Sequence, residues 1–170
     1  MFESKYLKDD IENIQHLLTI PALKNFETWD LAKLLRLSKI RQYDDGEVII
    51  KEGELDNWFY FILSGKVRIS KKGIDISTLN KESVLFGEMR LIDGLSRSAS
   101  VYSVGKTICF AVDISSKHRL GSEDEAASLL LLLYKMVAEF ISIRLRLSNE
   151  ELIIAKREIS RLKAAQLKMS

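Results

Sequence analysis

Cysteine and histidine are scarce in this 170-residue sequence, and each scarcity excludes a class of site. The single cysteine, Cys109, rules out a disulfide framework and a cysteine-rich metal site. The two histidines, His16 and His118, lie far apart without companion ligands beside them, so neither a zinc site nor a haem site is expected. The sequence also shows no nucleophile–base constellation. We therefore expect no catalytic residues, no metal and no cofactor.

An excess of charge of one sign and long apolar runs are also missing. The formal net charge is only +2, which by itself does not imply nucleic-acid binding. The apolar run at 129–133 is followed by Lys135 and Glu139, short of the ~18 apolar residues that a membrane span needs. Residues 1–20 contain no apolar core of the kind found in signal peptides. We expect a cytoplasmic protein that binds neither DNA nor a membrane directly.

Proline occurs once, and it divides an N-terminal segment, residues 1–40, that has helical character. Apolar residues recur at helical spacing on both sides of Pro21. They are Tyr6, Leu7, Ile11, Ile14, Leu17 and Leu18 before the proline, and Trp29, Leu31, Leu34, Leu35 and Leu37 after it. The spacing predicts one helix from about residue 3 and a second helix up to about residue 40.

Single glycines mark a change to β-structure. Over residues 43–113, short runs rich in Val, Ile, Phe and Tyr alternate with Gly46, Gly53, Gly65, Gly73, Gly87, Gly94 and Gly105. Strands of about 5–7 residues, with turn signals every 8–12 residues or so, indicate a compact antiparallel β-structure. The sequence therefore predicts an α+β, mainly β, chain whose β part covers residues 41–121.

Residues 122–170 contain neither proline nor glycine, which predicts one long helix, with 148–149 as a candidate break. Ser122 and Glu125 form a capping box at its start. A heptad follows, with Ala138, Leu145, Leu152 and Ile159 at position a and Ile141, Ser148, Ala155 and Leu162 at position d. Glutamates at g, Glu151 and Glu158, precede lysines at e, Lys156 and Lys163, as in parallel pairs of helices. We predict a hinge and dimerisation helix that forms a parallel homodimer.

Residues 86–101 combine one carboxylate and one guanidinium around a short apolar turn. Glu88 follows Gly87, and Arg97 comes nine residues after Glu88 among small residues. Small side chains let backbone N–H groups approach an anion, and an arginine offers donors that match phosphate oxygens. A carboxylate beside them accepts a hydrogen bond from a sugar hydroxyl. The segment predicts a site for a nucleotide with a phosphate and a free ribose hydroxyl; the alternative is a structural Glu88–Arg97 ion pair without a ligand.

This segment resembles the phosphate-binding cassette of cyclic-nucleotide-binding domains. That family includes the catabolite activator protein, regulatory subunits of cyclic-nucleotide-dependent kinases, and cyclic-nucleotide-gated channels. The similar motifs are Phe-Gly-Glu-Met at 86–89 and Arg-Ser-Ala-Ser-Val at 97–101, preceded by two glycine-punctuated strands at 46–53 and 60–67. The resemblance covers roughly residues 20–145. It implies an eight-stranded, jelly-roll-like, double-stranded β-roll with a short cassette helix around Met89–Ile92.

The resemblance also implies which residues bind the ligand. Glu88 would hold the ribose 2′-hydroxyl and Arg97 the cyclic phosphate, and nearby backbone amides would complete the cradle. The implied ligand-binding residues are Gly87, Glu88, Met89, Arg97, Ser98 and Ala99. Two positions depart from the family: Arg90 stands where alanine is usual, and Ser83 where glycine is frequent. An arginine at position 90 either adds a charge near the phosphate or points outward.

The family's domain binds its ligand without turning it over, so the resemblance implies a non-enzymatic, stand-alone sensor of a 3′,5′-cyclic nucleotide. We expect cAMP to be favoured over cGMP, although Ser98 leaves cGMP open. In the family the C-terminal helix closes over the bound base. Transcription factors of the family carry a helix-turn-helix domain after this helix, and none is expected here, so the effector would be another, unidentified protein. The alternatives are a dimeric assembly or adaptor module with a vestigial ligand site, and a regulator that heterodimerises with a full-length relative.

Overall fold

The computed structural model describes residues 1–8, 11–80 and 85–168, with side chains up to residue 165. Ser83, one of the two departures from the family pattern, lies outside the described residues. The chain divides into two compact units, Met1–Leu132 and Leu133–Ser170.

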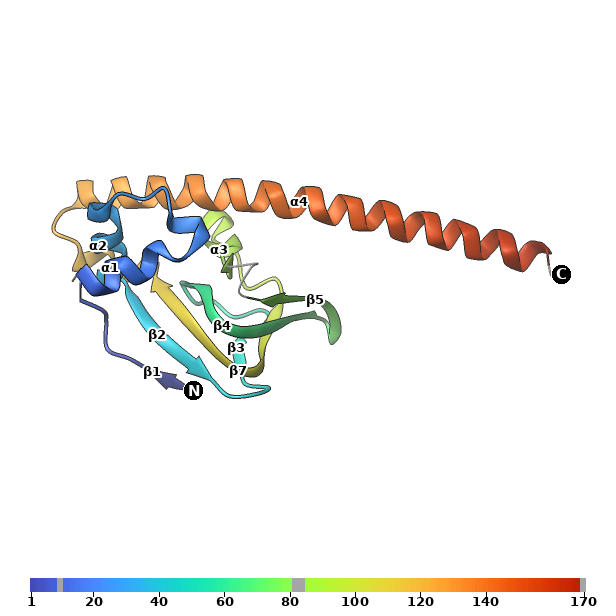
Figure 1. Cartoon of the computed structure of the whole chain (residues 1–170), viewed down its shortest axis with the longest axis horizontal. Helices are drawn as coiled ribbons and strands as arrows, with labels where there is room; N and C mark the ends of the chain where they lie inside the picture. Colours follow the sequence, from blue (N-terminus) through green and yellow to red (C-terminus); the bar gives the residue numbers. More distant parts are fainter. Residues whose placement is uncertain (9–10, 81–84, 169–170) are drawn as a thin grey trace. The chain divides into compact units, whose positions relative to one another are not determined.

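The first unit is built on an antiparallel sheet of seven strands (Figure 1). The strands are β1 (Phe2–Glu3), β2 (Ser38–Tyr43), β3 (Val48–Ile50), β4 (Trp58–Lys71), β5 (Ile74–Asn80), β6 (Leu85–Phe86) and β7 (Ser100–Asp113). Their order is β1-β2-β7-β4-β5, with β3 also paired to β7 and β6 to β4. The predicted fold class is confirmed: a mainly antiparallel β-structure with N-terminal helices and a long C-terminal helix.

The two longest strands, β4 and β7, have 14 residues each, more than the predicted strand length. Gly65 and Gly105, which we expected in turns, lie inside them. Gly65 has φ +89°, the β4–β7 register shifts around it, and a Cβ there would lie 2.5 Å from the Lys106 carbonyl oxygen. A glycine at such a bulge bends a strand without ending it. The shorter strands that we predicted are therefore continuous, and the described residues form seven strands rather than eight.

The N-terminal segment is less helical than its apolar spacing predicts. Its helices are α1 (Ile11–Leu18), the short 3-10 helix η1 (Pro21–Leu23) and α2 (Thr28–Arg36). The prediction of helix from residue 3 is wrong, because β1 pairs with β2 and the amides of Ser4 and Leu7 donate to β2 carbonyls at 2.9 Å. The prediction of helix up to residue 40 is also wrong, because β2 begins at Ser38. Sheet pairing with a distant strand outweighs local helical spacing in both places.

The core of the sheet has two faces, as expected from alternating side chains along a strand. One face holds a buried cluster: Tyr43, Ile50, Tyr60, Ile62, Val67, Leu79, Phe86, Val101, Cys109 and Ala111. On the other face, the rings of Phe59 and Phe61 from β4 and Phe110 from β7 pack together, with Phe61 in contact with the other two. Cys109 is buried in the first cluster, and burial raises the pKa of its thiol to about 12. It is therefore a core residue and not a reactive thiol.

The C-terminal helix α4 (Glu123–Lys168) has 46 residues and is continuous through 148–149. The predicted capping box begins it: the Glu125 amide donates to Ser122 Oγ at 3.2 Å, and the Glu125 carboxylate accepts from the Gly121 amide at 2.9 Å. By length and composition α4 contains a stretch that could cross a membrane. Core helices of soluble proteins pass the same test, so this is weak evidence. In the second unit, α4 exposes many aliphatic side chains.

Candidate functional site

Arg97 is the centre of a buried hydrogen-bond cluster, with 4% of its side chain exposed. Its Nε and Nη2 donate to the two carboxylate oxygens of Asp56 at 2.8 and 2.5 Å, a bidentate pair. Nη1 donates to the carbonyl of Gly87 at 2.6 Å, and Nη2 also donates to the carbonyl of Trp58. Four of the five guanidinium N–H groups are thus used by the described part of the chain. The guanidinium plane is fixed without a ligand.

Asp56 orients Arg97, although no motif in the sequence points to this residue. It lies just before β4 and also accepts a hydrogen bond from the Trp58 amide at 3.0 Å. Burial by itself raises the pKa of Asp56, but the hydrogen bonds and charge of Arg97 outweigh burial and hold this pKa below its ordinary value. The only signal in the sequence was an acidic residue just before an apolar strand. A carboxylate in such a place requires a partner when it is partly buried.

Gly87 and Glu88 form the turn before the cassette helix α3 (Met89–Asp93). Gly87 has φ +79°, and a Cβ there would lie 2.9 Å from Ile50 Cδ1 and 3.1 Å from Arg97 Nη1. Only glycine therefore gives the Gly87 carbonyl its position on Arg97 without strain. Glu88 follows with 4% exposure, and its own carbonyl accepts from the Leu91 amide at 2.9 Å. The predicted acidic residue is thus buried in the turn that contacts Arg97.

The backbone of Arg97 is held by the loop between β3 and β4. The Gly53 amide donates to the Arg97 carbonyl, and the Arg97 amide donates to the Glu54 carbonyl, both at 2.9 Å. The Glu52 amide donates to Ser100 Oγ at 3.0 Å. These contacts explain how an irregular segment keeps one conformation, since its main-chain polar groups are satisfied by a neighbouring loop.

The remaining predicted site residues lie nearer the surface. Met89 and Ser98 are exposed, and Ala99 is half-buried. Ser98 Oγ lies 3.6 Å from Met89 Sδ, so the residue after Arg97 lies beside the first residue of α3. The predicted residues therefore lie in the turn before α3, at the start of α3 and in the irregular stretch before β7, with Glu88 and Arg97 buried and Met89 and Ser98 at the surface.

Arg90, the residue that departs from the family pattern, binds the end of its own helix. Its Nη1 donates to the carbonyls of Gly94 and Leu95 at 2.9 and 2.7 Å, and its Nε to Asn57 Oδ1 at 3.2 Å. Carbonyls at a helix C-terminus lack helical partners, and a cationic side chain satisfies them well. Arg90 therefore stabilises the conformation of the cassette helix.

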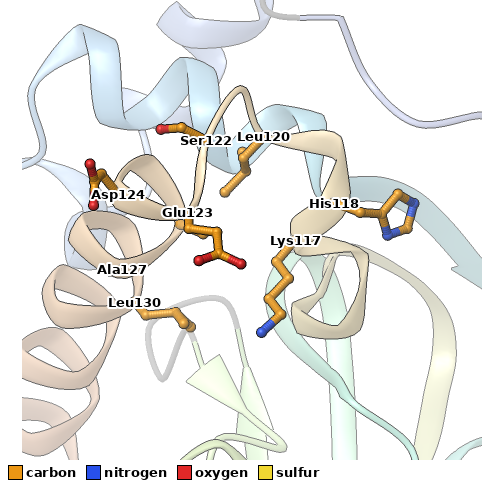
Figure 2. Close-up of a pocket in the computed structure, with 9 residues that line it drawn as sticks. Lys117, His118, Leu120, Ser122, Glu123, Asp124, Ala127 and Leu130 are labelled. Atoms are coloured by element: carbon orange, nitrogen blue, oxygen red, sulfur yellow. The ribbon is translucent and has the colours of Figure 1, made fainter.

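A cavity of about 660 Å³ lies elsewhere in the first unit, where the 3-10 helix η3 (Ile114–Arg119) leads into α4. The described residues that line it are Lys117, His118, Leu120, Ser122, Glu123, Asp124, Ala126, Ala127 and Leu130. Figure 2 shows Lys117, Glu123 and Leu130 pointing into it and His118 pointing away. None of these belongs to the predicted ligand-binding set. Among the described residues, no group of His, Cys, Asp and Glu could hold a metal ion.

Known proteins resemble this chain in both sequence and fold. The cAMP-dependent protein kinase regulatory subunit of Eremothecium gossypii is 32% identical over 105 residues, covering 62% of this chain and 22% of the relative. The type II regulatory subunit of cAMP-dependent protein kinase of Drosophila melanogaster is 35% identical over 124 residues, covering 70% of this chain and 31% of the relative. This chain therefore spans less than a third of the length of either relative.

The fold comparison covers more of the chain. A solved cyclic nucleotide-binding domain from Methylobacillus flagellatus KT superposes with a TM-score of 0.71 at 20% identity, covering 84% of this chain and 83% of that one. The family model of the cyclic nucleotide-binding domain matches residues 40–124, which is half of the chain. The match includes Asp56, the Gly87–Glu88 turn and Arg97. This chain belongs to the cyclic nucleotide-binding domain family.

Proposed function

We propose that this chain is a non-enzymatic receptor for a 3′,5′-cyclic nucleotide, in which Arg97 binds the cyclic phosphate and Glu88 the ribose 2′-hydroxyl. One observation carries the proposal: a buried arginine is fixed in its plane by Asp56 and by the Gly87 carbonyl, in the turn that also buries Glu88. An arginine that is oriented before binding loses little side-chain entropy when a phosphate arrives. Gly87, Met89, Ser98 and Ala99 complete the proposed site.

The electrostatics of the cluster are compatible with an anion. Asp56 binds one edge of the guanidinium, formed by Nε and Nη2, and the contacts among the described residues leave one Nη1–H for a phosphate oxygen. Asp56 forms an ion pair with Arg97. The position of Arg97 therefore does not require the alternative considered above, a structural Glu88–Arg97 ion pair. The Glu88 carboxylate is suited to a hydroxyl and not to the phosphate, which it would repel.

We favour cAMP over cGMP as the ligand. Both relatives are named as regulatory subunits of cAMP-dependent kinases. The Ser98 hydroxyl is exposed beside Met89, and a hydroxyl can bind either a ligand phosphate or a purine amino group. Only the contact with the purine would affect the preference between cAMP and cGMP, and Ser98→Ala is the variant that isolates the contribution of this hydroxyl.

The test of the function is a calorimetric titration of the full chain with cAMP and with cGMP. We expect cAMP to bind with micromolar or tighter affinity, and cGMP more weakly. Arg97→Ala should lose most of this affinity. Arg68→Ala is the matched control, because Arg68 is also paired with a carboxylate, Asp75, but on the exposed β4–β5 hairpin. Absence of binding of either nucleotide at millimolar concentration would contradict the proposal.

We further propose that the chain is a parallel homodimer through α4 and that its effector is another protein. Leu145, Leu152, Ile159 and Leu162 are each more than half exposed on one heptad seam. An apolar stripe of this kind, with charged residues beside it at the e and g positions, is typical of a helix that pairs with another helix. The same stripe favours the second candidate function, a dimeric assembly or adaptor module with a vestigial ligand site. The titration separates the two, because an assembly module would dimerise without binding a nucleotide.

A further inference from the structure

Cationic and aromatic side chains pack in a row through the first unit, from the segment after β1 to the start of the cassette. This cation–aromatic row consists of Tyr6, Lys39, Trp58, Arg41, Tyr60 and Phe86. None of the six belongs to the predicted ligand-binding set. The row nevertheless ends at Phe86, the residue directly before the Gly87–Glu88 turn.

Arg41 lies at the centre of the row, on β2, with 12% of its side chain exposed. Its guanidinium carbon is 3.7 Å from the centroid of the Trp58 ring, close enough for a cation–π interaction. Its Nη1 donates to the Tyr60 hydroxyl at 2.8 Å, and its Nε donates to Glu3 Oε2 at 2.6 Å. One side chain thus connects β1, β2 and β4.

Both β4 residues that Arg41 contacts also contact the cassette. The Trp58 carbonyl accepts from Arg97, and the Trp58 amide donates to Asp56, the partner of Arg97. The Tyr60 ring stacks on Phe86, with centroids 4.9 Å apart and planes 9° apart, and Tyr60 pairs with Phe86 between β4 and β6. A shift of Arg41 would therefore be transmitted to Arg97 through Trp58, and to Gly87 through Tyr60 and Phe86.

The N-terminal segment closes the row at its other end. Glu3 accepts from Lys39 at 2.6 Å as well as from Arg41. The Tyr6 ring lies between the cations of Lys39, at 4.6 Å, and Arg119, at 3.9 Å, and the Tyr6 hydroxyl donates to Asp113 at 3.0 Å. Glu3 thus supplies the negative charge that Arg41 requires in a partly buried position.

Stability alone does not explain a cation at this place. Arg41 stands beside the apolar cluster that contains Tyr43, Tyr60 and Cys109, where an aliphatic residue would lose no charge hydration. Replacing buried ion pairs by apolar residues is often neutral or stabilising. What the guanidinium provides and an aliphatic side chain does not is a planar group that holds three partners in fixed directions.

We propose that Arg41 is a positioning residue for the nucleotide site, which fixes the Trp58 carbonyl and the Tyr60–Phe86 stack and thereby the geometry of Arg97 and Gly87. It acts without touching the ligand. The inference rests on the proposed function for its effect on affinity. It also has a consequence for the protein without ligand, because the cassette should loosen when Arg41 is replaced.

The first measurement is cAMP affinity of the full chain. Arg41→Met, which keeps an unbranched apolar stem but removes the guanidinium and its charge, should weaken binding by about tenfold. Tyr60→Phe keeps the ring stack and removes only the hydroxyl that binds Arg41, and should weaken binding by about threefold. The matched control is Arg68→Met, because Arg68 has the same kinds of partners, the Asp75 carboxylate and the Tyr102 ring at 4.8 Å. It should bind within about twofold of the parent.

The second measurement is amide hydrogen exchange without ligand. In Arg41→Met and Tyr60→Phe, exchange should become faster in segments 53–58 and 86–98 and stay unchanged in the β4–β5 hairpin. Arg68→Met should show the opposite pattern. A purely structural role would instead speed exchange throughout the sheet, and such a uniform change overturns the proposal. Should Arg41→Met fail to fold, Tyr60→Phe decides.

The two measurements also separate this inference from the proposed function. If the parent binds no cyclic nucleotide, the proposed function fails, and the exchange pattern still decides the role of Arg41. If the parent binds cAMP and both variants bind it equally well with unchanged exchange at 86–98, the positioning role is wrong while the function stands.

Discussion

At the scale of single residues, the site depends on one buried ion pair. The Arg97 guanidinium and the Asp56 carboxylate form two parallel hydrogen bonds, with Asp56 30% exposed and Arg97 almost fully covered. Truncating one member of such a pair leaves the other without its charge partner, which costs more than the pair itself contributes. Residue-scale changes here should therefore affect both affinity and stability.

Arg97→Ala should remove useful nucleotide affinity. A truncated charge pair in a binding site costs roughly 2–5 kcal/mol, so a micromolar ligand should bind about 30-fold to several thousand-fold more weakly. The unfolding free energy should also fall, because Asp56 loses its bidentate partner. Calorimetric titration and thermal unfolding measure the two effects. A variant that binds cAMP like the parent would remove Arg97 from the site.

The Asp56–Arg97 ion pair should also make the free energy of unfolding depend on pH in the acidic range. Because the pKa of Asp56 is lower in the folded than in the unfolded state, the pair contributes fully above the unfolded pKa of about 3.9. This contribution is lost as the pH falls through the folded pKa. Asp56→Asn should therefore lose less stability than the parent between about pH 5 and pH 2, as measured by urea unfolding at several pH values. Parallel curves for the two proteins would contradict the assignment.

Glu88 should discriminate ribose from deoxyribose. A hydrogen bond to a charged group contributes about 1.5–3 kcal/mol, so 2′-deoxy-cAMP should bind about 10-fold to 150-fold more weakly than cAMP. Glu88→Gln should reduce that difference, since the amide is a weaker acceptor than the carboxylate. Titration of both ligands into both proteins is the measurement. Equal affinities of the parent for the two ligands would exclude this role of Glu88.

At the scale of elements, the cassette helix α3 lies between two glycines with positive φ, Gly87 at +79° and Gly94 at +66°. They differ in what a Cβ would meet: Gly94 has nothing within 4 Å, whereas Gly87 faces Ile50 and Arg97. Backbone strain is common to both positions, so a difference between them reports the close approach of Gly87 to Ile50 and Arg97.

Gly94→Ala should cost only the strain of a left-handed residue, about 1–2 kcal/mol of unfolding free energy, and leave cAMP affinity nearly unchanged. Gly87→Ala should cost more, about 2–4 kcal/mol when overpacking is added, and should weaken cAMP binding at least tenfold. Denaturant unfolding and titration of the two variants test this. Equal effects of the two substitutions on affinity would show that the turn does not position Arg97.

At the scale of the whole molecule, the exposed stripe on α4 makes the oligomeric state testable. Substituting Leu152 and Ile159 by Asp places charges on the predicted seam, and should convert a homodimer into a monomer. The matched control is Ile153→Asp with Ile154→Asp, because both are at least half exposed on the same helix but lie off the seam. Light scattering at tens of micromolar gives the mass. A monomeric parent would exclude the dimer, and dissociation of the control pair would contradict the heptad register.

Sequence alone determined the features whose physical causes are local. The cassette motif is contiguous, so its glycine, acid and arginine were identifiable from spacing. The capping box at Ser122 and the long helix after it follow from contacts between residues three or four apart and from the absence of proline and glycine.

Tertiary structure decided the features that depend on strand register. Asp56 is the partner of Arg97 only because β4 and the cassette are brought together across 41 positions of sequence. Helical spacing predicted a helix from about residue 3, yet residues 2–3 form β1, because β2, a strand distant in the sequence, pairs with them. Nothing in the sequence pointed to Arg41, because its partners lie on β1 and β4, which are distant from it along the chain. Pairings of this kind depend on which strands become neighbours, and no spacing within one segment encodes that choice.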